Sequence, residues 1–403
     1  MKRSGKRRGS AVLIRFMLMI MGLFAGNFFR TIPAFAAEPG DPGQEVWTQD
    51  AGSTALDLSE IENYLDRIGE QKTAGMTFGE LMNMIQAGDM EKIFLYGRDR
   101  IASALFSEIR TNASFLAEIL ILSLCGAACS GFFGIFGSGQ LSETGFYVIC
   151  ICVQTFLAAG FFSSIRIAEE TTGEILGFMK VLLPAYFLAV TMAGGAVTSA
   201  SVCGFTIGAI GVIQTVVSGF LLPVMKLYMV ISLVGNLFRE EMFSVMTELL
   251  GKVVGWTVKT MFGIVVGFHL IQGLVLPQAD AMKNAAVMRA VEAVPGVGAG
   301  AGVVSDLLLG SAVLIKNTAG AAAVAVLLFL AAVPMVKLNS PYGALLSGGS
   351  RDAARVRQTA DGMYNAECRG HGMLLKIVGY SLALFVVTIA VISYSTNAVY
   401  YAG

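Results

Sequence analysis

The chain has 403 residues, of which 55% are hydrophobic and 14% charged, and its mean hydropathy is +0.70. Soluble domains carry about 25% charged residues, so this composition excludes an ordinary soluble protein. The 28 basic and 28 acidic residues cancel, and no basic domain stands out, which argues against nucleic-acid binding.

The first 36 residues have the three parts of a secretory signal peptide. A basic start is followed by an apolar stretch at 16–29, and Ala34-Phe35-Ala36 has the small-x-small pattern of a cleavage site. An uncleaved signal anchor is the alternative. In both cases the sequence predicts that residues 37–114 emerge on the far side of the membrane.

Residues 37–114 are acidic and contain no cysteine, and we predict a small extracytoplasmic helical region there. Leu58, Ile61 and Leu65 recur at helical spacing. Thr77-Phe78-Gly79-Glu80 has the spacing of a capping box, and Asp89 is placed to cap a further helix.

The rest of the chain contains long segments without a charged residue. They are 119–142, 144–165, 181–225, 260–279, 317–336 and 377–403. Because a helix needs about 20 apolar residues to cross a bilayer, the sequence predicts an all-α, polytopic helical membrane protein with about seven or eight spans. We predict spans one to five in 115–238, a cytoplasmic interfacial helix at 239–259, a span at 260–277, a Gly/Ala-rich loop with a re-entrant segment at 278–316, a span at 317–338, a basic cytoplasmic loop at 339–373 and the last span within 374–403.

Several interruptions are expected inside these boundaries. Residues 166–180 are predicted to form a polar joint, and a turn near 199–201 to divide the longest apolar run. Pro223 begins a short apolar stretch that is expected to be tilted or broken. Residues 303–315 are short for a span, so we predict a re-entrant segment or half-helix.

Basic residues indicate the orientation of the spans. They gather in 239–259 and 337–376, which lie on the cytoplasmic side if residues 37–114 are exported. The signal peptide and the basic segments therefore agree on one topology.

Candidate functional residues are the polar and helix-breaking residues of the predicted spans, because such residues are costly in lipid. They are Asp306, Lys316, Lys226, Pro184, Pro223, His269 and Gln272.

Each polar candidate has a structural alternative. Lys226 and Lys316 can extend to the headgroups, and His269 and Gln272 can hydrogen-bond between helices. Asp306 needs a partner if it lies at membrane depth, and Lys316 is the nearest in sequence. Exposure of the whole segment around Asp306 is an equal alternative.

The sequence contains no P-loop, GxSxG or HExxH motif. Cys368 and His371 are close in sequence, but two ligands are too few for a metal site. We therefore predict no catalytic residues, no metal and no cofactor, in a protein that is not an enzyme.

Two parts of the sequence carry a family resemblance. One is RAVEAVPGVG at 289–298, followed by Ser305-Asp306 and GSAVLIKNTAG at 310–320. The other runs from Leu182-Leu183-Pro184 to MAGG at 192–195. Together with the order of signal peptide, exported region and polytopic body, these segments resemble the stage III sporulation protein AE family.

The resemblance implies an endospore-forming bacterium and a subunit in the mother-cell membrane around the forespore. It implies a multiprotein channel or secretion-like complex that maintains the forespore and its late gene expression. The implied partners are an AA-type ATPase, AG- and AH-type ring proteins and a forespore-side partner, beside the lipid bilayer. It assigns no catalytic residues.

A stand-alone secondary transporter for a small solute is the alternative hypothesis. In such a transporter Asp306, Lys316 and Lys226 would bind the solute or the coupling ion, because charges inside a membrane protein often mark a transport path.

Overall fold

The computed structural model describes residues 58–69, 76–99, 102–103, 106, 139–238, 241–292, 298–338 and 354–402. Every element assigned within these ranges is a helix, which confirms the predicted all-α class. The signal peptide predicted at 1–36 and residues 115–138, the start of the segment predicted to contain spans one to five, lie outside the described residues.

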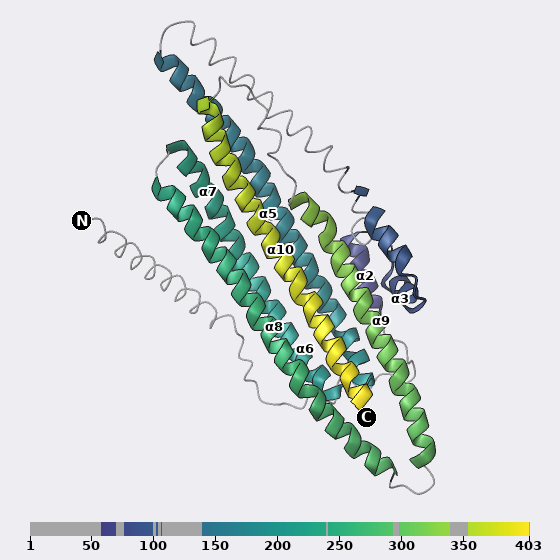
Figure 1. Ribbon diagram of the computed structural model, residues 1–403. Coiled ribbons are helices and arrows are strands. Elements are labelled where there is room, and N and C mark those ends of the chain that lie inside the picture. The colour runs from purple at the N-terminus through teal and green to yellow at the C-terminus, as the bar shows by residue number, and fades with distance from the viewer. Residues whose placement is uncertain are drawn as a thin grey trace, which may run out of the picture. The chain divides into compact units, whose positions relative to one another are not determined.

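The helices differ greatly in length. They are α2 (Ser59–Ile68), α3 (Phe78–Gln86), α5 (Gly139–Met192), α6 (Ala196–Val216), the π-helix η1 (Val217–Leu221), α7 (Leu222–Phe238), α8 (Glu241–Glu292), α9 (Gly298–Leu338) and α10 (Ala354–Ala402). A further helix occupies residues 90–99. The long helices lie side by side (Figure 1), and α10 contacts α5, α7, α8 and α9.

Five helical stretches in the described part of the chain are long and apolar enough to cross a membrane. They are Ala158–Met192, Ala196–Gly235, Met242–Ala286, Leu307–Leu338 and Ala366–Asn397. The sequence predicted more spans, partly because it divided segments that the structure joins into single helices.

Helix α5 runs through the polar joint that was expected at 166–180. The reason is amphipathic spacing, since Arg166 and Glu169 are exposed whereas Ile165, Ala168 and Ile175 are buried. The charged residues therefore lie on one face of a continuous helix and do not form a loop.

Other expected boundaries also fall inside helices. Helix α8 joins the interfacial helix predicted at 239–259 to the span that follows, and it continues past Pro277. Helix α9 joins the segment at 303–315, expected to be re-entrant, to the next span. The alanines of the Gly/Ala-rich stretch favour this helical conformation, whereas its glycines do not.

The longest apolar run is divided at Ala193–Gly195, before the expected position at 199–201. Gly194 has a φ of 85°, a left-handed conformation that glycine adopts without steric cost. Further along, the π-helix η1 ends directly before α7, whose second residue is Pro223. The break expected at Pro223 is therefore a local change of helix type.

Contacts with α10 show which residues of the other helices lie at the same level. Between residues 366 and 379 of α10, Ser164 lies beside His371, Tyr228 beside Ala366, Gly251 beside Met373 and Met335 beside Gly379. Near its end, Gly195 pairs with Thr396, Lys316 with Asn397 and Gly273 with Val391.

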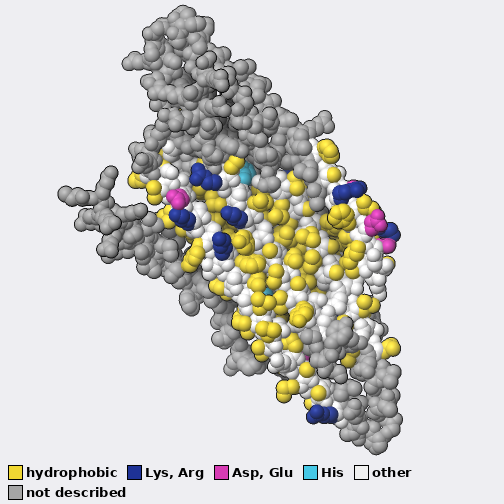
Figure 2. All heavy atoms as spheres, viewed as in Figure 1, with side chains coloured by type: hydrophobic (Ala, Val, Ile, Leu, Met, Phe, Trp, Pro, Cys, Tyr) yellow, Lys and Arg dark blue, Asp and Glu magenta, His cyan; other side chains and the backbone are white. Residues whose placement is uncertain are grey.

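Charged side chains of five helices gather near the first of these levels. This charged belt consists of Arg166, Glu169, Glu170, Lys226, Glu248, Lys252, Lys259, Lys337, Arg369 and Lys376. Figure 2 shows a group of basic side chains in the upper left part of the visible face, with hydrophobic side chains covering the region beside and below it.

The short N-terminal helices pack against the long ones. Thr77 caps α3 as predicted, since its side chain accepts from the Glu80 N–H and the Glu80 carboxylate accepts from the Thr77 N–H. Helix α2 contacts α5 and α3 contacts α9. The buried apolar residues of these two helices are Ile61, Leu65, Phe78 and Leu81.

Candidate functional site

Lys316 lies in the middle of α9 and is completely buried. Its ammonium donates to Thr396 Oγ1 at 2.5 Å, to Asn397 Oδ1 at 2.7 Å and to the Ser393 carbonyl at 3.4 Å. An ammonium has three N–H donors, so these three acceptors from α10 satisfy all of them. Lys316 therefore joins α9 to α10 and does not extend to a headgroup.

A second polar link joins the same two helices one residue along. Ser393 Oγ donates to Asn317 Oδ1 at 2.8 Å. The ion pairs of the described residues do not include Lys316, so its charge is surrounded by neutral acceptors. Hydrogen bonds to a charged group are stronger than neutral ones, so these contacts fix the register of α9 on α10.

Asp280 of α8 holds the start of α6. Its carboxylate accepts from the Val197 N–H at 2.7 Å, the Thr198 N–H at 3.0 Å and the Thr198 hydroxyl at 2.5 Å. These amides belong to the first turn of α6, where no helical carbonyl is available to accept from them. Asp280 is only 1% exposed, so it acts as a buried cap supplied by another helix.

The turn between α5 and α6 is held from the same helix. Asn284, one helical turn after Asp280, donates its amide to the Gly194 carbonyl at 3.0 Å. A side chain at Gly195 would meet the methyl group of Thr396, which also accepts from Lys316. The turn therefore lies directly against the Lys316 contacts.

We call these residues the polar cluster. Its members are Gly194, Gly195, Thr198, Asp280, Asn284, Lys316, Asn317, Ser393, Thr396 and Asn397. It brings together the end of α5, the start of α6 and parts of α8, α9 and α10. Both segments that carry the sequence resemblance contribute to it, through Gly194 and Gly195 and through Lys316 and Asn317.

A second buried polar group lies near the charged belt. His371 of α10 is 2.9 Å from Ser164 Oγ of α5, and the Phe161 ring packs edge-on against the imidazole. Glu367, one turn earlier, is 2% exposed, and its carboxylate has no hydrogen-bond partner among the described residues. Cys368 is exposed, so it lies on a different face from His371.

The remaining sequence candidates are not gathered with Lys316. Lys226 is exposed on α7 near the charged belt, and Pro184 is exposed within a continuous α5. Pro223 lies beside η1. Asp306 belongs to α9, but its side chain is outside the described part of that helix.

His269 of α8 is buried. The structural alternative from the sequence was that it forms a hydrogen bond between helices, and the structure differs. Its ring packs edge-on against Phe205 of α6 with centroids 5.0 Å apart. Among the described residues, neither ring nitrogen has a hydrogen-bond partner, and the same holds for Oε1 of half-buried Gln272. An aromatic contact therefore replaces the expected polar one.

Sequence reasoning missed Asp280, Thr198 and Asn397. Asp280 was assigned to a loop, although it directly follows the charge-free segment 260–279. An apolar run of about 20 residues ends at the membrane surface. The position of Asp280 at the end of such a run could therefore have indicated a residue placed at that surface. Thr198 and Asn397 gave no signal, since nothing in the sequence indicates that they face an ionised group.

The polar cluster holds the helices together through hydrogen bonds between polar groups. Interhelical hydrogen bonds between polar side chains hold membrane bundles together in the absence of a hydrophobic driving force. Here a carboxylate neutralises a helix N-terminus and an ammonium is shared among three oxygens, which fixes five helix segments relative to one another.

Comparisons with known proteins identify the family. The family model described as Stage III sporulation protein AE (spore_III_AE) matches residues 76–396. A protein of Bacillus subtilis (strain 168) named Stage III sporulation protein AE is 22% identical over 312 residues, covering 74% of this chain and 78% of that protein. No solved structure gives a significant match. The family model spans most of the chain, which therefore belongs to the stage III sporulation protein AE family.

Proposed function

We propose that this protein is a membrane subunit of a multiprotein sporulation channel or secretion-like complex that links mother cell and forespore. It would reside in the mother-cell membrane around the forespore and support forespore maintenance and late gene expression. The family match over residues 76–396 is the observation that carries this proposal.

The long apolar helices support a role inside the membrane. Exposed apolar side chains on several of them, including Ile264, Leu274 and Leu314, offer surfaces to lipid or to other subunits. We propose other stage III sporulation proteins as partners, namely an AA-type ATPase, AG- and AH-type ring proteins and a forespore-side partner. In this arrangement the ATPase supplies the energy.

The rival hypothesis of a stand-alone transporter has weaker support. It needs Lys226 and Lys316 near one site. Lys226 is two residues from Tyr228, which donates to the Ala366 carbonyl of α10, whereas Lys316 donates to Asn397. About 30 helical residues separate those levels, or about 45 Å. The donors of Lys316 are also already engaged with protein acceptors.

Deletion of the gene in its spore-forming host tests the proposed function. We expect engulfment to finish and a forespore-specific late reporter to fail, and a plasmid copy of the full chain to restore the reporter. Normal spores from the deletion strain would contradict the proposal.

Purification at the engulfment stage tests the partners. The tagged chain, extracted in mild detergent, should carry other stage III proteins with it. If the purified chain alone drives solute uptake into liposomes under an ion gradient, the transporter hypothesis is favoured instead.

A further inference from the structure

We propose that helices α2, α3 and 90–99, here called the N-terminal layer, lie at the membrane surface on the same face as the charged belt. The apolar side of helix 90–99 then enters the boundary between lipid headgroups and acyl chains. The partner of this surface is the lipid bilayer.

The first step is the position of the bilayer along the helices. On α10 the charged belt ends at Lys376, and the polar cluster lies at Asn397. About 20 residues separate them, or about 30 Å of helix, which matches the hydrocarbon thickness of a bilayer. On α8 the charge-free stretch between Lys259 and Asp280 has nearly the same length.

The second step is the level at which α2 contacts α5. The Tyr64 hydroxyl donates to the Glu174 carbonyl at 3.0 Å, and the phenol ring lies over Gly177. Along α5, Glu174 is about 15 Å from Ser164 at the charged belt and about 30 Å from Gly195 at the polar cluster. Burial of this phenol raises the pKa of Tyr64, as expected for a side chain enclosed by another helix.

Helix 90–99 gives an independent measure of the same level. Gly97 packs against Phe329 of α9. Phe329 is about 12 Å from Lys337 in the charged belt and about 20 Å from Lys316 in the polar cluster. Both contacts therefore place the N-terminal layer closer to the charged belt than to the polar cluster.

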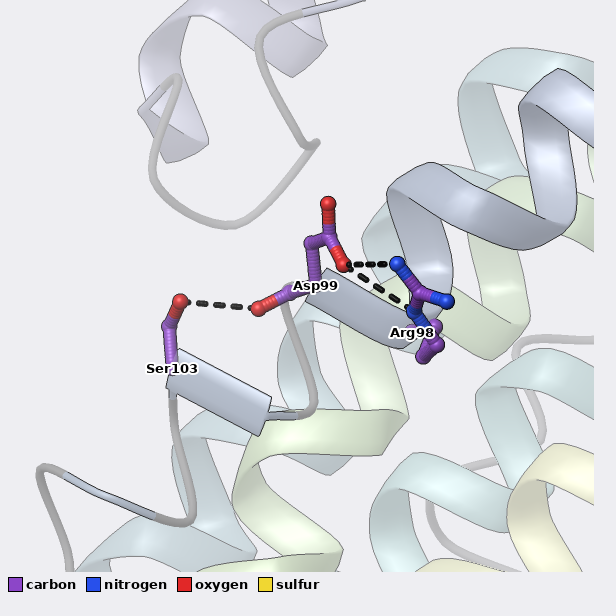
Figure 3. A network of polar contacts seen from close by, with 3 residues as sticks. All are labelled: Arg98, Asp99 and Ser103. Carbon is purple, nitrogen blue, oxygen red and sulfur yellow. Dashed lines mark hydrogen bonds and ion pairs between the residues drawn. The ribbon is translucent and has the colours of Figure 1, made fainter.

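The chemistry of helix 90–99 fits an interfacial position. Met90 and Phe94, one helical turn apart on one face, are 56% and 72% exposed, and Tyr96 on another face is 49% exposed. Charged pairs also occur here: Lys92 pairs at 2.6 Å with Asp89, the residue before the helix, and Arg98 pairs at 3.0 Å with Asp99 (Figure 3). Apolar and charged side chains on one short helix are typical of segments that lie about 5–10 Å deep in the boundary region, and tyrosine is enriched there.

This arrangement changes the predicted topology. The sequence placed residues 37–114 and the basic segments on opposite faces of the membrane, whereas the contacts of α2 and helix 90–99 place the N-terminal layer and the charged belt on one face. The signal peptide predicts that the N-terminal layer is exported, and the basic residues predict that the charged belt is cytoplasmic. If both lie on one face of the membrane, one of these two predictions is wrong.

Cysteine labelling of sealed cells tests the proposal. In a cysteine-free background, single cysteines replace exposed Asn83 of α3, Glu248 of the charged belt and Lys283, which is exposed at the level of the polar cluster. With a membrane-impermeant maleimide, Asn83→Cys and Glu248→Cys should react alike, both before or both only after permeabilisation, and Lys283→Cys should behave oppositely. Asn83→Cys reacting together with Lys283→Cys would overturn the proposal.

A second measurement does not depend on the cysteine-free background. Phe94→Trp, in a chain whose Trp47 and Trp256 are replaced by phenylalanine, is reconstituted in vesicles containing brominated lipids. Bromine near the headgroups should quench its fluorescence more than bromine at the acyl-chain ends. Absence of quenching by either lipid would overturn the lipid contact.

A matched pair of glycine variants separates docking from general damage. A methyl group at Gly177 would collide with the Tyr64 phenol, whereas the same group at Gly173 of the same helix meets no atom within 4 Å. Gly177→Ala should weaken the quenching of Phe94→Trp and Gly173→Ala should leave it unchanged. Equal quenching in both variants would show that the α5 contact does not position the layer.

Discussion

At the residue scale, replacing Lys316 and removing one of its hydrogen-bond acceptors should destabilise the protein by different amounts. A buried ammonium is costly, and its acceptors offset that cost. Replacing the lysine removes both terms, whereas removing an acceptor leaves the charge buried with fewer partners. The second change therefore destabilises the protein more.

We expect Asn397→Leu to lower the free energy of unfolding by about 1.5–3 kcal/mol, which is the contribution of a hydrogen bond to a charged group. Lys316→Met should cost less, because Thr396 keeps its bond to the Ile392 carbonyl. Thermal unfolding in detergent micelles gives the order of the variants. In the double variant the cost of Asn397→Leu should shrink, and strictly additive losses would contradict the hydrogen bond as the cause.

Asp280 should behave as a helix cap. Asp280→Ala leaves the Val197 and Thr198 amides without an acceptor and should cost about 2 kcal/mol, at the upper end for a lost cap. Asp280→Asn keeps one side-chain carbonyl and should be intermediate. Lys283→Ala, an exposed change in the same helix, is the control and should stay within about 0.5 kcal/mol. Equal thermal unfolding midpoints for Asp280→Ala and the wild-type protein would show that Asp280 does not act as a helix cap.

At the element scale, the packing of α10 depends on where its glycines lie. A methyl group at Gly370 would collide with the Phe161 ring, and Tyr228 is close by, whereas Gly372 has open space around it. Gly370→Ala should therefore cost about 1–3 kcal/mol through overpacking. Gly372→Ala should be neutral or stabilise by up to about 1 kcal/mol, through the higher helix propensity of alanine. Similar thermal midpoints for the two variants would contradict the packing of α10 on α5.

Helix type was predictable from this sequence, but helix boundaries were not. Apolar runs and the Thr77 capping box indicated helices correctly because they depend on local spacing. The segment at 166–180 was misassigned because charges on one helix face and charges in a loop give the same composition. Continuity through Pro277 likewise depends on neighbouring helices, which the sequence does not display.

The polar cluster was predictable only in part, for the same reason. Lys316 was identified because a charge in an apolar run is conspicuous. Asn397 and Thr198 are ordinary residues that gain importance from partners about 80 positions away in sequence. Such partners emerge only when the helices pack.

At the scale of the whole molecule, the apolar region between the charged belt and the polar cluster indicates that lipid, not water, surrounds this part of the protein. Ile264, Leu274 and Leu328 are 65%, 72% and 49% exposed, and apolar area exposed on this scale is favourable only in lipid or detergent. The chain should therefore remain in the membrane pellet after alkaline carbonate washing and enter solution only with detergent. Size-exclusion chromatography in detergent should then give a single symmetric peak. A folded, monodisperse fraction in detergent-free supernatant would mean that another subunit or surface covers these side chains, and the assignment of this region to the bilayer would fail.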